Sequence, residues 1–302
     1  MNDGPRILVL GAGGQLGTEL QSRFAGTGPL VAVDREAVDF NVPDQIRAIV
    51  RNVQPDVILN SAAYTAVDRA ETEQEAAMAI NAEASRILAE EALRTNALLV
   101  HYSTDYVFDG SKASPWTEED PTGPLNAYGA SKLAGEDAIR KVGGRFLIFR
   151  TSWVYGPHGK NFLLTMLRLG RERESLSIVD DQFGGPTTSI ELAHATRAIV
   201  DGVLAGTFGA AQDWAGLYHM TCSGTTTWYG FTQAIFARAG ALLNGRRPKI
   251  TPITSEQYPV PARRPRHSVL SNKKLEARFG VRLGSWESAL DTVIEQLSAQ
   301  TH

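Results

Sequence analysis

The feature that most constrains the fold is the regular alternation of short apolar runs with amphipathic segments over the first half of the chain. Runs rich in Val, Ile and Leu predict buried strands at 6–10, 30–34, 56–60, 97–103 and 145–153. Helical spacing fills the intervals, from about residue 15 and at 45–53, 71–95 and 126–141. Strands separated by helices form a parallel sheet, and right-handed crossovers place helices on both of its faces. We therefore predict an α/β protein with a doubly wound, Rossmann-like parallel sheet.

After residue 153 the alternation weakens, which predicts a second, smaller lobe. Helices are predicted at 161–173, 189–204, 227–243 and 285–298, with short strands near 176–179, 217–222 and 250–253. A length of 302 residues suits two domains. We expect a dinucleotide-binding domain and a C-terminal substrate-binding lobe. The first would span 1–152 with returning segments at about 187–205 and 216–223, and the second 153–186 and 224–302.

Bulk composition excludes several classes of partner. Hydrophobic residues make up 43% of the chain and charged residues 21%, as in ordinary soluble proteins. A net charge of -3 offers no basic field for nucleic acid or anionic lipid. The only cysteine, Cys222, excludes an internal disulfide, and we expect it to be a small buried residue. With no leader and no apolar run of about 18 residues, we expect a cytoplasmic protein that binds a small molecule.

A glycine-rich turn follows the first predicted strand. GAGGQLG (11–17) places Gly11, Gly14 and Gly17 between a strand and a helix. Glycines there permit a tight turn and a close approach of the backbone to a pyrophosphate, and the helix N-terminus attracts its charge. The spacing does not satisfy G-x-G-x-x-G, because Leu16 stands where the last glycine would be. The strand before and the helix after the turn favour a dinucleotide site over a bare helix-capping turn.

Asp34, which ends the second predicted strand, and the residue after it bear on the choice of cofactor. Asp34 stands where an acid normally accepts hydrogen bonds from the adenosine ribose. Arg35 follows it and offers a partner to a 2′-phosphate. The sequence therefore leaves NADPH and NADH open.

A tyrosine and a lysine lie four residues apart in LNAYGASKLAGE (125–136). Tyr128 and Lys132 share one face of the predicted helix, among small residues that leave room beside them. Alone, such a pair is usually a surface feature. Ser103 and Thr104, however, add hydroxyls at the carboxyl end of a predicted strand, the edge where parallel sheets bind ligands. A phenol beside an ammonium group has a lowered pKa and is a usable general acid.

Several segments in order carry a resemblance to a known family. GAGGQLG, NSAAYTAVD (60–68), HYSTDYVFDG (101–110) and YGASK resemble the extended short-chain dehydrogenase/reductase family. Further segments narrow the resemblance to the dTDP-4-dehydrorhamnose reductases, nearly end to end: FRTSWVYG (149–156), DDQFGGPT (180–187), GLYHMTCSGTTTW (216–228) and PARRPRHSVL (261–270). These enzymes reduce the 4-keto group of dTDP-4-dehydro-β-L-rhamnose with NADPH or NADH. The product, dTDP-L-rhamnose, is a sugar donor for cell-envelope polysaccharide, and this is the last step of its synthesis.

The resemblance implies roles for particular residues. Tyr128 would give the proton, Lys132 would lower the pKa of Tyr128 and hold the nicotinamide ribose, and Thr104 would hydrogen-bond the substrate oxygen. The implied cofactor-binding residues are Gly11, Gly14, Gln15, Leu16, Gly17, Asp34, Arg35, Asp39, Phe40, Ala63, Tyr64, Thr65, Tyr128 and Lys132. The implied substrate-binding residues are Thr104, Asp105, Trp153, Gln182 and Arg263.

Two alternatives stay open. Sugar-nucleotide epimerases keep the Tyr–Lys pair, whereas dehydratases typically carry an Asp-Glu pair where this chain has Asp105 and Tyr106. A non-catalytic subunit resembling the regulatory subunit of methionine adenosyltransferase is the second alternative. Some relatives dimerise around Mg²⁺ through C-terminal acids, but Glu191, Asp291 and Glu295 fit that pattern imperfectly. We predict no protein-held metal and leave monomer or homodimer open.

Overall fold

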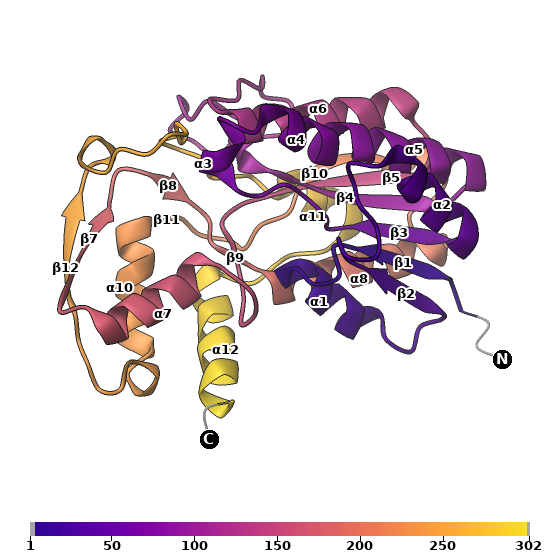
Figure 1. Cartoon of the computed structure of the whole chain (residues 1–302). Helices are drawn as coiled ribbons and strands as arrows, with labels where there is room; N and C mark the ends of the chain where they lie inside the picture. The colour runs from indigo at the N-terminus through magenta and orange to yellow at the C-terminus, as the bar shows by residue number, and fades with distance from the viewer. Residues whose placement is uncertain (1–3, 301–302) are drawn as a thin grey trace.

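A six-stranded parallel sheet forms the centre of the molecule in the computed structural model, which describes residues 4–300 (Figure 1). The strand order is β10-β5-β4-β3-β1-β2, and every neighbouring pair is parallel. The strands are β1 (Ile7–Leu10), β2 (Leu30–Val33), β3 (Val57–Asn60), β4 (Leu98–Thr104), β5 (Phe146–Thr151) and β10 (Gly216–His219). The predicted doubly wound sheet is confirmed.

Helices cover both faces of the sheet because alternate strand residues point to opposite sides. Ile7 and Val9 contribute to one core, with α1 (Gln15–Phe24) and α8 (Ser189–Leu204). Leu8 and Leu10 contribute to the other, with α2 (Pro43–Val53), α5 (Ala84–Thr95) and α6 (Ala127–Val142). Figure 1 shows these two helical layers above and below the strands.

The segment predicted as one helix over 71–95 is interrupted. A short α4 (Gln74–Met78) leads into a π-helical turn, η1 (Ala79–Glu83), before α5 begins. Another short helix, α3 (Val67–Ala70), precedes them. Single π-turns inside helices often occur at functional sites, and η1 packs against α6, which carries Tyr128.

A smaller lobe with its own hydrophobic cluster lies at one end of the sheet (Figure 1). Its main helices are α7 (Phe162–Glu172), α10 (Trp228–Arg238) and α12 (Trp286–Ala299). The parallel pair β7 (Ser175–Val179) and β12 (Lys249–Ile253) borders them. Short elements complete it and link it to the sheet: β6 (Val154–Tyr155), β8 (Phe183–Gly184), β9 (Thr187–Thr188), β11 (Thr226–Thr227), η3 (Ala241–Leu243) and η4 (Ser255–Gln257).

The sequence pattern also missed the short helices α9 (Ala211–Trp214) and α11 (Lys273–Phe279). Leu275 and Phe279 of α11 belong to the sheet-domain core, and Phe279 packs edge-on against Tyr218 of β10. We therefore propose a domain boundary that assigns this segment to the sheet domain, inside the range 224–302 expected for the substrate lobe.

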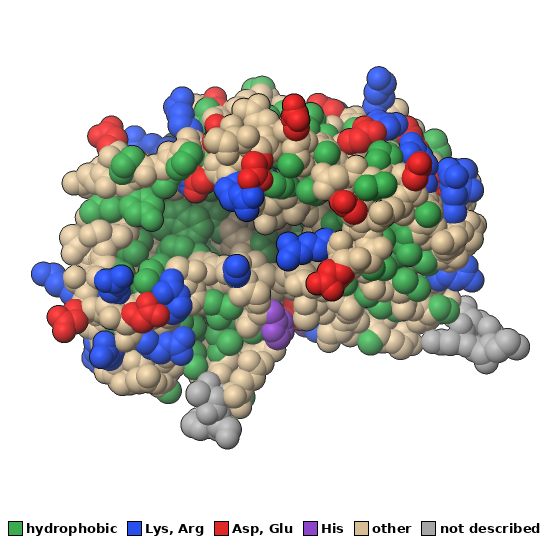
Figure 2. Space-filling model, viewed as in Figure 1, with side chains coloured by type: hydrophobic (Ala, Val, Ile, Leu, Met, Phe, Trp, Pro, Cys, Tyr) green, Lys and Arg blue, Asp and Glu red, His purple; other side chains and the backbone are tan. Residues whose placement is uncertain are grey.

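The space-filling view shows a hollow between the sheet domain and the smaller lobe, with hydrophobic side chains on its floor and Lys or Arg along its rim (Figure 2). Between residues 4 and 300, no helix has the length and apolar character needed to cross a membrane.

Candidate active site

The candidate site lies at the carboxyl edge of the parallel sheet. After β1 the chain passes to β2 on one side and later to β3 on the other, so the strand order reverses between β1 and β3. Open parallel sheets bind ligands at such a switch point. The predicted glycine turn follows β1, the loop 63–65 follows β3, and Thr104 ends β4.

The backbone of the glycine turn packs closely, because its glycines have no side chains. Gly11 has a φ of 80°, in the region that favours glycine, and a Cβ on Gly17 would lie 2.1 Å from the Gly11 carbonyl oxygen. Gly14 is the N-cap of α1 and has no side chain to occupy the first N–H groups of the helix. Those N–H groups and the positive end of the helix dipole suit a diphosphate.

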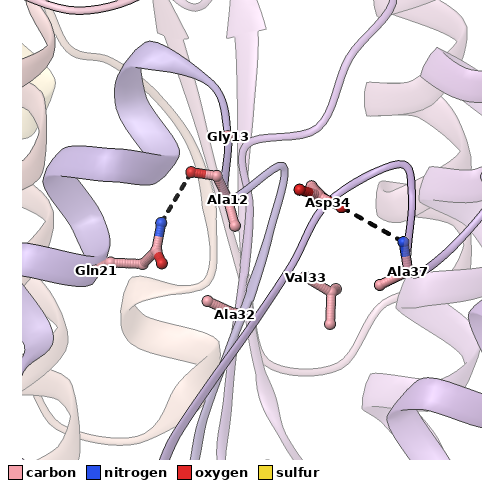
Figure 3. Close-up of a pocket in the computed structure, with 7 residues that line it drawn as sticks. All are labelled: Ala12, Gly13, Gln21, Ala32, Val33, Asp34 and Ala37. Atoms are coloured by element: carbon pink, nitrogen blue, oxygen red, sulfur yellow. Dashed lines mark hydrogen bonds between the residues drawn. The ribbon is translucent and has the colours of Figure 1, made fainter.

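A cavity of about 350 Å³ adjoins this turn (Figure 3). Ala12 and Gly13 border it on one side, and Asp34 and Ala37 border it on the other. Asp34 Oδ1 accepts hydrogen bonds from the backbone N–H of Glu36 at 3.0 Å and of Ala37 at 3.4 Å. These bonds fix the carboxylate beside the cavity, where a ribose hydroxyl can reach it. Arg35, the next residue along the chain, is exposed.

Four of the predicted cofactor-binding residues have side chains that are buried or hydrogen-bonded to other residues of the protein. Leu16 and Phe40 are buried in the two cores of the sheet domain, so only their backbone is left to face a ligand. Asp39 is exposed, and its carboxylate accepts from both nitrogens of Asn41. Gln15 Oε1 accepts from Asn161 Nδ2 at 2.9 Å, which ties the glycine turn to the N-cap of α7 in the smaller lobe.

Asn81 in the π-turn holds the loop after β3. Its Oδ1 accepts from Tyr64 N at 2.8 Å, and its Nδ2 donates to Tyr64 O at 3.1 Å and to Ser131 Oγ at 2.9 Å. Ala63 and Tyr64 are half-buried, whereas Thr65 is exposed. The loop is therefore fixed against α6, beside the residues predicted to be catalytic. Sequence reasoning missed Asn81.

Thr104 and Tyr128 meet at the end of β4. The Thr104 hydroxyl accepts from Tyr106 N at 3.2 Å and shares its single proton between two neighbours, Asp105 Oδ1 at 3.1 Å and the Tyr128 oxygen. Burial of the phenol raises the pKa of Tyr128 to about 12; the Thr104 hydrogen bond opposes the shift and the Asp105 charge adds to it. Desolvation sets the direction of this shift, and the lowering expected from Lys132 stays a prediction.

Lys132 is almost fully buried one turn further along α6. Its ammonium donates to Tyr102 O at 2.6 Å and lies 3.3 Å from His101 Nε2. Burial lowers the pKa of Lys132 to about 8, and the negative charge of Glu136 opposes that shift. The ammonium is thus largely charged at pH 7, and its neighbours hold it in place.

Glu136 lies one turn after Lys132 on the same face of α6. It is fully buried, and Arg150 of β5 donates to it twice, from Nε at 2.9 Å and from Nη2 at 2.6 Å. Ser103 also donates to it. The predicted hydroxyl at Ser103 therefore serves this ion pair, and Thr104 is the hydroxyl beside Tyr128.

Small residues of α6 explain how closely this helix packs. A Cβ on Gly129 would lie 2.2 Å from Tyr106 O, and one on Gly135 would lie 2.2 Å from Asn81 O. Asn126 caps the helix by accepting from Gly129 N at 2.8 Å. The small residues around the Tyr–Lys pair therefore bring α6 against both the end of β4 and the π-turn.

Asp105 is a buried carboxyl beside Thr104. Burial raises the pKa of Asp105 to about 7, and the nearby hydroxyls of Ser268 and Thr104 oppose the shift. Among residues 4–300, its Oδ2 has no hydrogen-bond partner. Such an oxygen can accept from a sugar hydroxyl.

Two tryptophans stack on each other where the chain leaves the sheet domain. Trp153 follows β5, is half-buried and has a φ of 46°, a strained backbone conformation for this residue. Its ring stacks on Trp228 of α10 with centroids 3.5 Å apart. Gln182 Oε1 accepts from Trp228 Nε1 at 3.1 Å, and Gln182 Nε2 donates to Ser255 Oγ at 2.9 Å. The amide of Gln182 therefore fixes the stack.

The arginine-rich loop docks onto the site through its backbone. Asn126 Nδ2 donates to Arg263 O at 2.7 Å, while the Arg263 side chain is exposed. Arg264 forms a bidentate salt bridge with Asp68: Nη1 donates to Oδ1 at 3.0 Å and Nη2 donates to Oδ2 at 2.9 Å. This pair anchors the loop beside α3, and the Arg263 side chain remains exposed.

Comparisons with known proteins agree on one family. The family described as RmlD substrate binding domain matches residues 5–299. A dTDP-4-dehydrorhamnose reductase of Burkholderia thailandensis is 48% identical over 300 residues, covering 98% of this chain and 100% of the relative. Another from Escherichia coli K12 is 43% identical over 302 residues, covering 98% and 99%. This chain belongs to the dTDP-4-dehydrorhamnose reductase family.

Solved structures of the same family are similar to this chain. The crystal structure of dTDP-4-dehydrorhamnose reductase from Bacillus anthracis in complex with NADP has a TM-score of 0.88 and 33% identity, covering 97% of this chain and 99% of that one. A Thermus thermophilus UDP-glucose 4-epimerase with NAD has a TM-score of 0.75 at 20% identity, covering 97% and 99%. The second likeness shows the fold alone.

The acids considered for a metal lie apart in this reductase-family chain. Glu191 Oε2 accepts from Gly284 N at 3.0 Å, Asp291 pairs with Arg238 at 2.5 Å, and Glu295 is exposed. Within residues 4–300, no three His, Cys, Asp or Glu side chains gather closely enough to share a metal ion.

Proposed function

We propose that this chain reduces the 4-keto group of dTDP-4-dehydro-β-L-rhamnose to give dTDP-L-rhamnose, with NADPH or NADH as reductant. The observation that carries the proposal is the meeting of Thr104, Tyr128 and Lys132 at the sheet edge, next to the glycine turn. Membership of the reductase family supports the choice of substrate, and the NADP in the Bacillus anthracis relative supports the choice of cofactor.

The cofactor is held by the turn and the loops beside it. The backbone of Gly11–Gly17 receives the pyrophosphate at the N-terminus of α1. Asp34 and Arg35 lie at the adenosine end, and the loop 63–65 lies toward the catalytic residues. The close approach enforced by Gly17 and the cavity beside Asp34 support this fit.

The proton comes from Tyr128. When bound, the reduced nicotinamide supplies a hydride to C4 of the sugar. A phenol whose pKa is about 12 is protonated at neutral pH, so Tyr128 starts the reaction as an acid and gives its proton to the C4 oxygen. Thr104 hydrogen-bonds the same oxygen, and Lys132 holds the nicotinamide ribose.

The substrate lies between the two lobes. Asp105 accepts a hydrogen bond from a sugar hydroxyl, and the Trp153 ring packs against the sugar nucleotide. Gln182 acts through Trp228, and Arg263 pairs with the diphosphate. We further propose that the enzyme works in the cytoplasm as a monomer or homodimer without a protein-held metal.

The test is an NADPH- and NADH-oxidation assay with dTDP-4-dehydrorhamnose generated in situ. We expect stoichiometric loss of reduced cofactor and formation of dTDP-L-rhamnose. Isomerisation of the sugar without net cofactor oxidation would instead indicate an epimerase. Binding of the cofactor with no sugar chemistry would indicate a non-catalytic subunit.

A further inference from the structure

A buried histidine lies against the ammonium group of the proposed active site. His101 in β4 is 1% exposed, and its Nε2 lies 3.3 Å from Lys132 Nζ. On its other side, Nδ1 lies 3.0 Å from the side-chain amide of Asn60, the last residue of β3. These two residues begin the sequence segments HYSTDYVFDG and NSAAYTAVD, and the proposed mechanism gives neither of them a role.

The donors and acceptors at this contact allow one consistent arrangement. An ammonium group only donates, so His101 must accept at Nε2. A neutral imidazole that accepts at Nε2 carries its proton on Nδ1, which then needs an acceptor. Only an oxygen of Asn60 can serve, because the amide nitrogen is itself a donor.

A second observation supports the same arrangement. Asn60 is 2% exposed, and among residues 4–300 its Oδ1 has no hydrogen-bond partner while Nδ2 faces His101. A half-turn of the amide exchanges its oxygen and nitrogen and moves nothing else. Oδ1 then accepts from Nδ1–H, and Lys132 donates to Nε2.

We propose that Asn60 and His101 form a positioning relay that holds the Lys132 ammonium in place and keeps it charged. The relay acts through Lys132, so it rests on the proposed function and touches no substrate. Asn60 fixes the tautomer of His101, and the neutral ring presents a lone pair to the ammonium. Together with the Tyr102 carbonyl, this gives Lys132 two acceptors from one strand.

The charges around the relay come from two further elements. On α6, Tyr128 and Glu136 lie one turn before and after Lys132, and Arg150 of β5 is paired with Glu136. Burial, with the charge of Lys132, lowers the pKa of His101 well below its usual value. His101 therefore stays neutral over the working range, and Lys132, with a pKa of about 8, is the group that titrates.

The test is the pH profile of kcat/KM for NADPH in His101→Leu. Removing a hydrogen bond to a charged group should lower the pKa of Lys132 by about one unit. The alkaline limb should therefore move to lower pH, and kcat/KM should fall about tenfold near pH 9 with little change near pH 6. In His101→Gln, the amide oxygen can still accept from Lys132, so the alkaline limb should lie close to its wild-type position.

Two further variants keep the proposal falsifiable. Asn60→Leu should move the limb in the same direction, because Nδ1–H loses its acceptor. His219→Leu removes another buried histidine, one that contacts Trp116 and Phe108, and should lower stability without moving the limb. A loss of kcat/KM by His101→Leu that is uniform with pH, or no rescue by His101→Gln, would overturn the relay.

A readout that does not need turnover separates this inference from the proposed reaction. Lys132 is expected to hold the nicotinamide ribose, so NADPH affinity measured by calorimetry between about pH 6 and pH 9 should show the same shift in His101→Leu. A wild-type protein that fails to reduce the dTDP-sugar would end the proposed function, and this binding profile would still test the relay. Identical profiles in wild type and His101→Leu would overturn it.

Discussion

At the scale of single residues, burial shifts the pKa values of Tyr128 and Lys132 in opposite directions. It raises the pKa of the Tyr128 phenol to about 12 and lowers that of the Lys132 ammonium to about 8, because desolvation disfavours the charged form of each. The phenol is therefore protonated at neutral pH, as a proton donor must be. Lys132 loses its charge first as pH rises, so we expect its titration to set the alkaline limit of activity.

Arg35 gives a prediction about cofactor choice. Asp34 faces the cavity with a fixed carboxylate, while Arg35 is exposed beside it. Arg35→Ala should lower the ratio of kcat/KM for NADPH to that for NADH by about tenfold, the value of one charge-assisted hydrogen bond. Arg94→Ala, at an exposed arginine on α5, is the control. An unchanged ratio in Arg35→Ala would mean that Arg35 does not contact the 2′-phosphate.

The tyrosine–lysine pair could be predicted from the sequence, but the residues that contact Lys132 could not. The spacing of Tyr128 and Lys132 and the hydroxyl of Thr104 could be predicted, because each lies at a position that the fold dictates. The partners of Lys132 could not, because His101 and Asn60 are polar residues inside apolar strands. Their contacts depend on which strands become neighbours, and the local pattern does not encode that.

At the scale of elements, the glycine turn and α1 form one unit. A Cβ on Gly14 would meet only the Gly11 carbonyl oxygen, at 3.2 Å, whereas one on Gly17 would meet it at 2.1 Å. Gly14→Val should therefore keep the fold and weaken cofactor binding by at least about tenfold, because the side chain fills the space where the backbone approaches the phosphates. Calorimetry and thermal melting measure the two effects.

A control at another glycine sharpens this test. Gly240 has open space around its Cβ position, so Gly240→Val should leave cofactor affinity unchanged. Gly14→Val with wild-type affinity for NADPH, in a protein that melts normally, would show that the pyrophosphate binds elsewhere.

Long elements could be predicted and short ones could not. The strands β1 to β5 and the helices α6, α7, α8 and α12 agree with the sequence pattern to within about two residues, because each buries a full apolar stripe. Helix α11 has seven residues and is stabilised by packing against β10. The π-turn within 71–95 has no periodic signature, since its extra residue depends on contacts with α6 and the loop after β3.

At the scale of the whole molecule, the proposed substrate site lies between the two lobes. Trp153 leaves the sheet domain in a strained conformation and rests on Trp228 of the smaller lobe, with Gly184 beneath its ring. Backbone strain of this kind persists where surrounding contacts enforce it. The sequence singled out Trp153, but its support by Trp228 depends on the packing of the two lobes.

Trp228→Leu should therefore impair substrate binding. Without its stacking partner, Trp153 would lose its fixed orientation, and KM for the dTDP-sugar should rise about tenfold, since a stacked aromatic pair and its area contribute roughly 1–2 kcal/mol. The Kd for NADPH should change little. Gln233→Ala, at an exposed position on the same helix, is the control. A KM for the dTDP-sugar in Trp228→Leu equal to that of the wild type would contradict a role for the stack.

The most direct test of the central claim is the turnover of Tyr128→Phe in the NADPH-oxidation assay with dTDP-4-dehydrorhamnose. This change keeps the ring and removes only the proton that the phenol donates. We predict that kcat falls by ~10²–10⁴-fold, the usual worth of general acid catalysis, while the Kd for NADPH stays within about twofold. Tyr218→Phe, at a buried tyrosine that bonds Trp214 O, should keep most of its turnover. Near-wild-type kcat in Tyr128→Phe would contradict the account.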